Sequence, residues 1–281
     1  MPALPPPSAD ELTAQLFAAR DLVLEAGELL LARLGQAGPR EAKSGTEFVT
    51  EADREAEALV LAGLERLFPA DHVLAEEAGE TGAATGARTW YLDPLDGTTN
   101  FAHGHPFFSV SLGCADRGGL LFGLVGAPYL DELYLAQRGG GAVLERPGHG
   151  LCRPLGRRGP VALERALLAT GFPYVRDELV DRNTELVRDF LKAPCHGVRR
   201  GGSAAIDLCH TAAGTLDGYW EFSLRPWDTA AGTLVAREAG CLVTAADGSG
   251  VEVPAASILA APPDLHAAML AVIATAERRT R

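Results

Sequence analysis

The sequence predicts a layered α/β protein in which two lobes pack together as one compact unit. Two amphipathic helices come first, a run of short apolar segments separated by turns follows, and strand-like and helix-like segments then alternate. The chain has 281 residues, 47% of them hydrophobic and 22% charged, which is enough to bury a large core. We expect residues 1–150 to form an α+β lobe and residues 151–281 an α/β lobe.

Capping residues and apolar periodicity define the first two helices. Ser8 and Glu11 have the spacing of a capping box, and apolar residues then recur at three- and four-residue steps as far as Leu34. Glycine and proline residues directly after Leu34 predict the end of this helix. We expect a polar loop over residues 40–49 and a second helix that begins near Thr50.

Short apolar segments separated by turn residues predict an antiparallel meander. They cover residues 72–75, 89–92, 107–114, 120–127, 132–136 and 142–144. The glycines at 139–141 lie between two of these segments and no helix follows, so they predict a tight connection and not a phosphate loop. Residues 146–160 are rich in glycine, proline and arginine, and we interpret them as a linker between the lobes.

After this linker, strands and helices alternate in the prediction. The expected strands are 166–170, 218–222, 241–244 and 257–261, and the expected helices are 182–192, 203–213, 229–239 and 264–278. Alternation of this kind favours a layered α/β arrangement.

Composition excludes several classes of protein. The net charge of −12 argues against a nucleic-acid partner, because such proteins need a basic face to neutralise phosphates. The five cysteines are widely spaced and form no C-x-x-C pair, which argues against a disulfide framework or a zinc ribbon. We find no signal peptide and no apolar run of membrane-spanning length, so we expect a cytoplasmic protein without a membrane partner.

The string D-P-L-D-G-T-T-N at residues 93–100 carries most of the predicted chemistry. An apolar strand leads into Asp93 and Asp96, and carboxylate oxygens bind hard divalent cations. Gly97 permits a tight turn, and N–H groups at a helix start near Thr98 can hold a phosphate. A metal beside a phosphate cradle is what metal-assisted phosphoryl hydrolysis requires. An ordinary Asp–Gly turn explains fewer of these residue types.

Further carboxylates lie in three other regions. Glu76 and Glu77 follow an apolar segment, and adjacent side chains of an extended chain point to opposite sides, so we expect one to face a site and the other solvent. Asp53 lies in the first turn of the second helix, and Asp228 has the pattern of a helix N-cap. A solvated loop, a helix-dipole interaction and a cap are alternative explanations of these residues, and the residues alone leave both interpretations open.

These motifs resemble those of the inositol monophosphatase family, in the magnesium-dependent, lithium-sensitive phosphatase superfamily. The family's D-P-[IL]-D-G-T-T-N-F stands at 93–101, its W-D-x-A-[AG]-G at 227–232, its T-x-x-D at 50–53 and its E-E at 76–77. The motifs keep the family order, and the resemblance spans about residues 16–275. It implies a layered α-β-α-β-α sandwich of the inositol monophosphatase and fructose bisphosphatase type, with the site between the lobes.

The resemblance also implies a role for each site residue. The metal ligands would be Glu76, Asp93, Asp96, Asp228 and the carbonyl of Leu95, and the phosphate would meet the N–H groups of Gly97 and Thr98. The catalytic group would be Thr98 with Asp53 behind it to orient or deprotonate the attacking water, together with Glu76. Lys43 would lie near the site, and the substrate contacts would be Ser203, Ala204, Glu221 and either Arg199 or Arg200. Ser203 stands where the family has threonine, which keeps the hydroxyl.

The activity implied by the resemblance is Mg²⁺-dependent hydrolysis of a small polyol phosphate. The T-T-N-F continuation favours inositol 1-phosphate, cleaved to inositol and phosphate with two or three Mg²⁺ ions in the site. The alternative substrates are histidinol phosphate, fructose 1,6-bisphosphate and a nucleotide phosphate. The alternative from another class is a regulatory or binding protein on the same scaffold. By the same resemblance we expect a lithium-sensitive homodimer.

Overall fold

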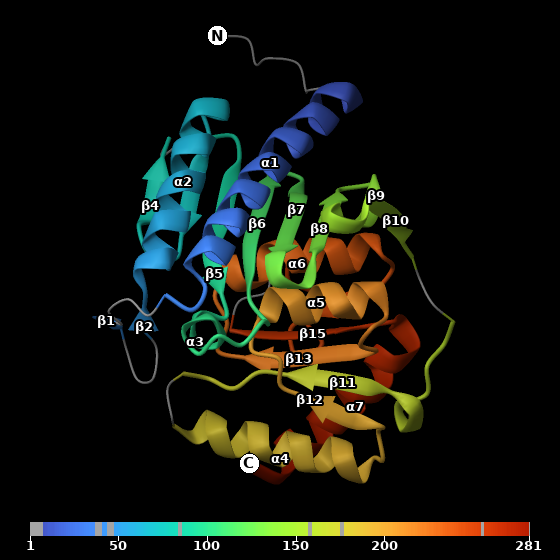
Figure 1. Ribbon diagram of the computed structural model, residues 1–281. Helices are drawn as coiled ribbons and strands as arrows, with labels where there is room; N and C mark the ends of the chain where they lie inside the picture. Colours follow the sequence, from blue (N-terminus) through green and yellow to red (C-terminus); the bar gives the residue numbers. More distant parts are fainter. Residues whose placement is uncertain are drawn as a thin grey trace.

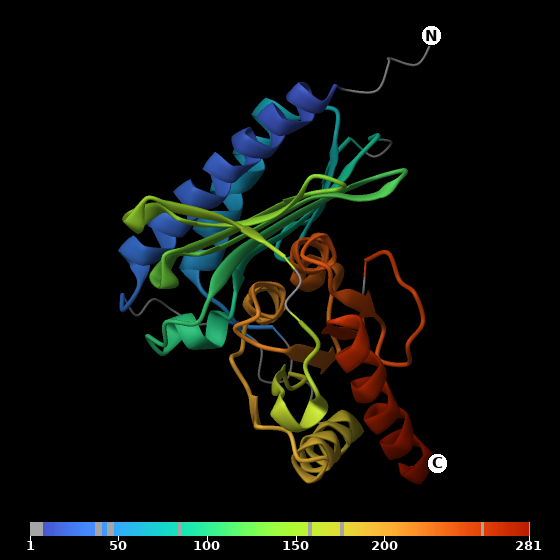
Figure 2. The ribbon, with the colours of Figure 1, turned by 90° about the vertical axis from the view of Figure 1, so that its right-hand side faces the viewer.

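A computed structural model describes residues 8–280 apart from 37–40, 44–47, 84–85, 157–158, 175–176 and 254–255. Its helices and sheets form five layers in the order α-β-α-β-α, as the two views in Figures 1 and 2 show. The outer helices are α1 (Ala9–Arg33) and α2 (Glu51–Leu67), the middle pair is α5 (Ala204–Ala213) and α6 (Pro226–Glu238), and the far pair is α4 (Glu178–Lys192) and α7 (Pro263–Thr280). The predicted layered α/β fold is confirmed.

The first sheet has eight strands and contains the predicted meander. In spatial order they are β10 (Leu151–Leu155), β9 (Gly141–Arg146), β8 (Glu132–Gln137), β7 (Gly119–Ala127), β6 (Ser109–Asp116), β5 (Thr89–Asp96), β3 (His72–Ala75) and β4 (Gly79–Gly82). Neighbouring strands are antiparallel except for β3 and β5, which are parallel. The predicted antiparallel meander is therefore confirmed from β5 to β9, and the inclusion of residues 72–75 in it was wrong. The sequence analysis did not predict β4.

The second sheet has five strands and lies between the middle and far helix pairs. In spatial order they are β12 (Gly197–Arg199), β11 (Leu167–Thr170), β13 (Gly218–Phe222), β15 (Ser257–Ala261) and β14 (Leu242–Thr244). The strands β11, β12 and β13 are mutually parallel, whereas β15 runs antiparallel to both of its neighbours. The three-residue strand β12 was not predicted.

Two segments predicted as irregular contain short strands. In the expected loop over 40–49, β1 (Glu41–Ala42) pairs with β2 (Phe48–Val49). In the expected linker over 146–160, a 3₁₀ turn at Pro147–His149 leads into β10, which pairs with β9. Pro154 is tolerated there because β10 is an edge strand, with one side free of ladder partners. β10 therefore joins the first sheet, although it falls within residues 151–281 that we assign to the second lobe.

Local chemistry explains where two helices begin. Ser8 caps α1 and forms the predicted reciprocal capping box with Glu11. α6 begins at Pro226, earlier than the predicted residue 229, because proline is well suited to the first helical position. This earlier start corrects the predicted role of Asp228. It lies in the first turn and accepts a hydrogen bond from the N–H of Arg225, the actual N-cap, at 2.7 Å.

Small residues let α6 approach the first sheet closely. A Cβ at Gly113 of β6 would lie 2.7 Å from the Cβ of Ala230, and a Cβ at Gly123 of β7 would lie 2.5 Å from the carbonyl of Ala231. The glycines and alanines are therefore required by packing, and they fix the start of α6 against the end of β5. Within the described ranges, no helix has both the length and the apolar character needed to cross a bilayer.

Candidate active site

One cavity of about 440 Å³ brings together residues from both halves of the chain. Of the predicted site residues it is lined by Lys43, Glu76, Asp93, Leu95, Asp96, Gly97, Thr98, Ala204, Glu221 and Asp228. Asp53, Arg199 and Ser203 are not among the lining residues. The four carboxylates predicted to bind metal thus line the same cavity, although they are separated in sequence by up to 152 residues.

An irregularity at the end of β5 turns two carboxylates toward this cavity. On a regular strand Asp93 and Asp96 would point to opposite faces, because they are three residues apart. The pairing of β5 with β6 shifts register between these two residues, and Pro94 has no N–H to donate. Both carboxylates consequently line the cavity, and Asp93 accepts a hydrogen bond from the N–H of Leu95 at 3.0 Å.

Burial leaves these carboxylates with little compensating charge. It raises the pKa of Asp93 and of Asp228 well above the usual range, and neighbouring carboxylates raise both further. Burial also raises the pKa of Glu76 to about 7 against the opposing effect of Lys43. The pKa of Asp96 rises to about 6 through burial, although hydrogen bonds from Ser203 and Ala205 oppose the shift.

This donor set fits a hard divalent cation. Carboxylate and carbonyl oxygens are the ligands that Mg²⁺ prefers, and an ion would relieve the repulsion among the buried carboxylates. In the described parts of the chain, no three His, Cys, Asp or Glu side chains are already gathered tightly enough to enclose one ion.

The pair Glu76 and Glu77 differs from the prediction. Both residues line the cavity, and the ammonium of Lys43 contacts both carboxylates, at 2.8 Å for Glu76. The expectation that one would face solvent was wrong because β3 ends at Ala75 and the next residues form a turn, where strand alternation no longer applies. The N–H of Glu77 donates to Glu57 at 2.9 Å and fixes this turn.

The predicted phosphate cradle lies at the start of the short helix α3 (Thr98–Ala102). Gly97 is its N-cap, with φ of 96°, and a Cβ at this position would lie 2.9 Å from the carbonyl of Phe107. Both conformation and space therefore require glycine. Gly97 and Thr98 line the cavity, and the first N–H groups of a helix have no partners within the helix.

Asp53 lies behind Thr98, as predicted, and not in the cavity wall. The Thr98 hydroxyl lies 3.0 Å from Asp53 Oδ1 and 3.0 Å from the carbonyl of Leu95. The other oxygen of Asp53 accepts from the hydroxyl and the N–H of Thr50. Burial raises the pKa of Asp53, and the bonds from Thr50 and Thr98 lower it. A hydroxyl that donates to Asp53 keeps its oxygen lone pairs for a water molecule.

The predicted substrate contacts divide into residues in the cavity and residues outside it. Arg200 lines the cavity, whereas Arg199 is exposed on β12 and donates to the carbonyl of Val198 at 3.4 Å. Ser203 is buried and donates to Asp96 at 2.6 Å, so its hydroxyl supports a carboxylate and does not face the cavity. The N–H of Ala205 donates to the same oxygen at 2.8 Å.

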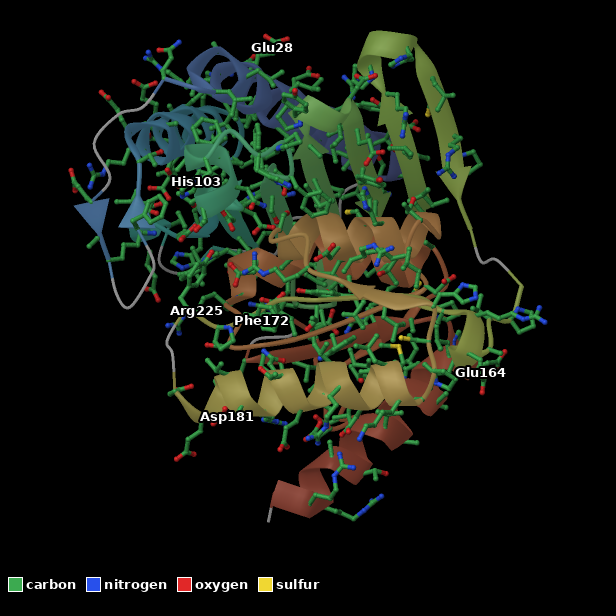
Figure 3. The ribbon with its side chains drawn as sticks, turned by 60° about the horizontal axis from the view of Figure 1, so that its bottom comes forward. Glu28, His103, Glu164, Phe172, Asp181 and Arg225 are labelled. Carbon is green, nitrogen blue, oxygen red and sulfur yellow. The ribbon has the colours of Figure 1, made fainter. Side chains whose placement is uncertain are left out.

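Three lining residues that directly follow β11 of the second sheet were not predicted from the sequence. They are Phe172, Pro173 and Tyr174. The loop after β13, which supplies Ser223, Leu224 and Arg225 to the cavity, was predicted to shape the pocket. Figure 3 labels Phe172 and Arg225, two of the residues that line this cavity. The signal was available, because segments that follow parallel strands commonly form the crevice at their carboxyl ends.

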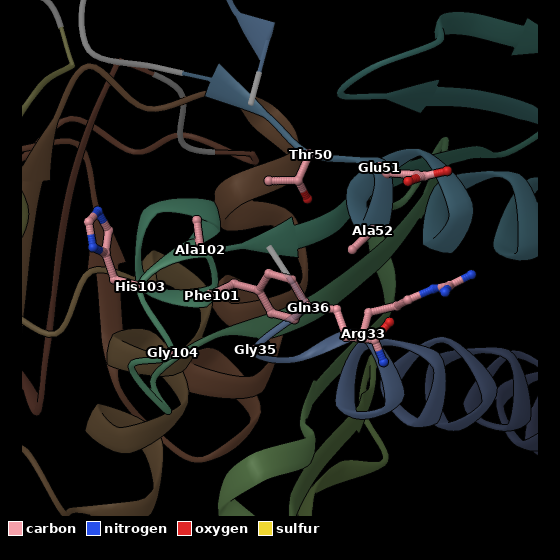
Figure 4. Close-up of a pocket in the computed structure, with 10 residues that line it drawn as sticks. All are labelled: Arg33, Gly35, Gln36, Thr50, Glu51, Ala52, Phe101, Ala102, His103 and Gly104. Carbon is pink, nitrogen blue, oxygen red and sulfur yellow. The ribbon is translucent and has the colours of Figure 1, made fainter. Parts of the chain in front are cut away.

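A larger cavity of about 640 Å³ lies between the end of α1, the start of α2 and α3 (Figure 4). It is lined by Arg33, Gln36, Phe101 and His103, among others, and by none of the predicted metal, phosphate or substrate residues. Volume alone does not identify a catalytic site, and the buried carboxylates favour the smaller cavity.

Comparisons with known proteins agree on one family. The family model described as "Inositol monophosphatase family" matches residues 11–278. A relative from Synechocystis sp. named inositol-1-monophosphatase is 40% identical over 260 residues, covering 92% of this chain and 88% of the relative. The Nus factor SuhB of Pseudomonas aeruginosa is 43% identical over 231 residues, covering 80% and 82%. The crystal structure of the extragenic suppressor protein suhB from Bartonella henselae matches with a TM-score of 0.84 and 32% identity, covering 92% and 98%.

Proposed function

Because the chain belongs to the inositol monophosphatase family, we propose that it is a phosphatase that hydrolyses a small polyol phosphate, with inositol 1-phosphate as the first candidate. The observation that supports this most strongly is the cavity in which the carboxylates of Glu76, Asp93, Asp96 and Asp228 meet the Gly97–Thr98 turn. No cysteine lines that cavity among the described residues, so a water molecule is the nucleophile in our proposal.

Glu76, Asp93, Asp96, Asp228 and the carbonyl of Leu95 would hold two or three Mg²⁺ ions. When bound, these ions supply positive charge for the phosphate oxygens and lower the pKa of a bound water. Gly97 and Thr98 direct N–H groups to the phosphate. Thr98, held by Asp53, orients the attacking water together with Glu76. The water oxygen bonds to phosphorus and gives up a proton, the ester P–O bond breaks in line, and the leaving alkoxide takes up that proton to become the alcohol.

The substrate's alcohol part would lie against the second lobe. Ala204 leaves room for a ring, Glu221 accepts hydrogen bonds from hydroxyl groups, and the guanidinium of Arg200 lies on the same wall. A site built to bind hydroxyls discriminates against esters that lack them, because its buried polar groups are then left unpaired. Histidinol phosphate, fructose 1,6-bisphosphate and nucleotide phosphates remain alternative substrates for the same chemistry.

Phosphate release from a panel of esters tests this proposal. The panel holds inositol 1-phosphate and the three alternatives, each with Mg²⁺, with EDTA, and with Mg²⁺ plus lithium. We expect Mg²⁺-dependent, lithium-inhibited release that favours inositol 1-phosphate. Asp93→Asn should lower turnover more than about a hundredfold, because it removes a charge from the metal site. Asp116→Asn, which changes a surface carboxylate at the end of β6, is the matched control.

The Nus factor SuhB relative supports a second candidate, a binding or regulatory role on the same scaffold. Absence of phosphate release from every ester, by folded and Mg²⁺-loaded protein, would reject the phosphatase and favour this role. The net charge of −12 argues against nucleic acid as the direct partner. The cytoplasmic location and the homodimer remain part of the proposal, and sedimentation measures the latter.

A further inference from the structure

Glu221 has a tyrosine partner on its own strand. Tyr219 and Glu221 are two residues apart on β13 and therefore point to the same face, toward α5 and α6. The Tyr219 hydroxyl donates a hydrogen bond to Glu221 Oε2. Tyr219 itself is fully buried in the core between the two sheets, so its hydroxyl is held in place by packing.

A glycine on the adjacent strand makes room for the Glu221 carboxylate. β11 and β13 are parallel with Thr170 opposite Trp220, so Gly171 lies beside Glu221. A Cβ at Gly171 would lie 2.0 Å from Glu221 Cδ and from Oε1, a separation that real atoms do not adopt. The carbonyl of Gly171 accepts from Asn183 Nδ2 at 3.1 Å and from the Thr170 hydroxyl at 3.3 Å, which fixes this strand end.

The carboxylate of Glu221 retains free acceptor capacity. An ionised carboxylate accepts about four hydrogen bonds, and within the described residues Tyr219 is its hydrogen-bond donor. Arg200 is close enough to favour the charged form of Glu221, and among the ion pairs of the described residues none joins the two. The remaining lone pairs belong to a side chain that lines the cavity.

We propose that Tyr219 is a positioning residue, which together with the space at Gly171 holds Glu221 in the orientation that recognises substrate hydroxyl groups. This inference rests on the proposed function. It names the residues that would make the phosphatase prefer polyol phosphates over simple phosphate esters. Without the tyrosine hydroxyl, Glu221 would rotate more freely, and binding would have to order it. The loss should appear in binding of hydroxyl-bearing substrates and not in the step at phosphorus.

The first test is Tyr219→Phe. With Mg²⁺ present, KM and kcat are measured for inositol 1-phosphate and for p-nitrophenyl phosphate, an ester without ring hydroxyls. We expect KM for inositol 1-phosphate to rise about tenfold relative to KM for the aryl ester. The matched control is Tyr134→Phe. It removes a hydroxyl that donates to Glu132 at 2.8 Å, again two residues away on a strand but away from the cavity.

A second variant tests the space requirement independently of the hydroxyl. Gly171→Ala places a methyl group where the Glu221 carboxylate lies and should give the same selective rise in KM. Gly159→Ala is its control, because no atom lies within 4 Å of a Cβ there and its φ is not positive. Thermal unfolding of each variant separates a positioning effect from a loss of fold.

Three outcomes are decisive. A selective rise in KM for inositol 1-phosphate in both variants supports the inference. An equal change for both esters, or no change in a folded Tyr219→Phe protein, overturns it while leaving the phosphatase intact. Failure of the wild-type protein to hydrolyse either ester rejects the proposed function itself, and the inference with it.

Discussion

Two strands in different sheets carry a tyrosine and a glutamate two residues apart, joined by the same hydrogen bond. On β8, the Tyr134 hydroxyl donates to Glu132 at 2.8 Å. Glu132 also accepts from Arg146 at 2.6 Å and lies 2.9 Å from His210 Nε2. On β13, Tyr219 is the donor that the described residues offer to Glu221. Glu132 is therefore surrounded by donors from the protein, and Glu221 is not.

The two carboxyl groups have opposite pKa shifts for this reason. Burial acts to raise the pKa of Glu132, but His210, Tyr134 and Arg146 together bring it below its usual value. Burial raises the pKa of Glu221 to about 7, because Tyr219 and Arg200 compensate it only in part. The same tyrosine–glutamate pair therefore differs between the two sheets. On β8 the glutamate accepts from several protein donors, whereas on β13 it keeps acceptor sites for a ligand. The pKa values of Glu76, Asp93, Asp96 and Asp228 are raised, like that of Glu221 and unlike that of Glu132.

The largest expected difference concerns stability. Glu132→Ala leaves the buried Tyr134 hydroxyl and the largely buried His210 ring without their acceptor, and should lower the free energy of unfolding by about 3 kcal/mol. Asp93→Asn removes a buried and repelled charge, so in EDTA it should not lower this free energy. Urea titrations of both variants measure the difference. If Glu132→Ala were as stable as the wild-type protein, the donors around Glu132 would not offset the free-energy cost of burying its carboxylate.

The second prediction uses pH to separate the two kinds of carboxyl group. Glu76, Asp96 and Glu221 have folded pKa values of about 7, 6 and 7, above their unfolded values, so the folded protein binds more protons between about pH 4.5 and 7. In EDTA the free energy of unfolding should therefore fall by about 6 kcal/mol from pH 5 to pH 8. Glu132 contributes the opposite slope, but only below its unfolded pKa near 4.5.

Saturating Mg²⁺ is the control for this titration. Bound cations keep the carboxylates ionised in the folded protein, so the fall between pH 5 and pH 8 should disappear. A rise in the free energy of unfolding from pH 5 to pH 8 in EDTA would contradict this. It would mean that enough positive charge lies near these carboxylates to stabilise their ionised form.

The smallest expected effect comes from Arg146, the half-exposed donor among those that surround Glu132. The Arg146 side chain is 41% exposed, so Arg146→Met should lower the free energy of unfolding by only about 0.5 kcal/mol, with unchanged kcat and KM. Thermal unfolding and the phosphatase assay check this. If Arg146→Met lowered the free energy of unfolding as much as Glu132→Ala, then Arg146 alone would offset the cost of burying the Glu132 carboxylate.

Local signals allowed the helices, the meander and the D-P-L-D-G-T-T-N string to be predicted. The capping box at Ser8 and the glycine at 97 act within a few residues, so their effects are visible in sequence. The strands β10 and β12 were missed because each depends on a partner whose position only the fold provides.

Register explains the errors at the site. The choice between Arg199 and Arg200 depends on which face a three-residue strand presents, and sequence does not specify that face. Glu76 and Glu77 were assigned opposite directions because strand alternation was applied beyond the predicted strand end at Ala75, where the chain forms a turn. The packing that holds Ser203 against Asp96 joins residues 107 positions apart, and no local pattern indicates it.

The bond from Ser203 to Asp96 has a consequence for genetic dissection of this protein. Asp96 ends a strand of the first sheet, yet its carboxylate is fixed by Ser203 and Ala205 at the start of α5, from the other half of the chain. A gene fragment encoding residues 1–150 would carry Glu76, Asp93 and Asp96 without the helix that orients one of them, and it would also lose β10 from the sheet edge. Complementation by two separately expressed fragments therefore requires that they reassemble, and recovered activity would report that reassembly directly.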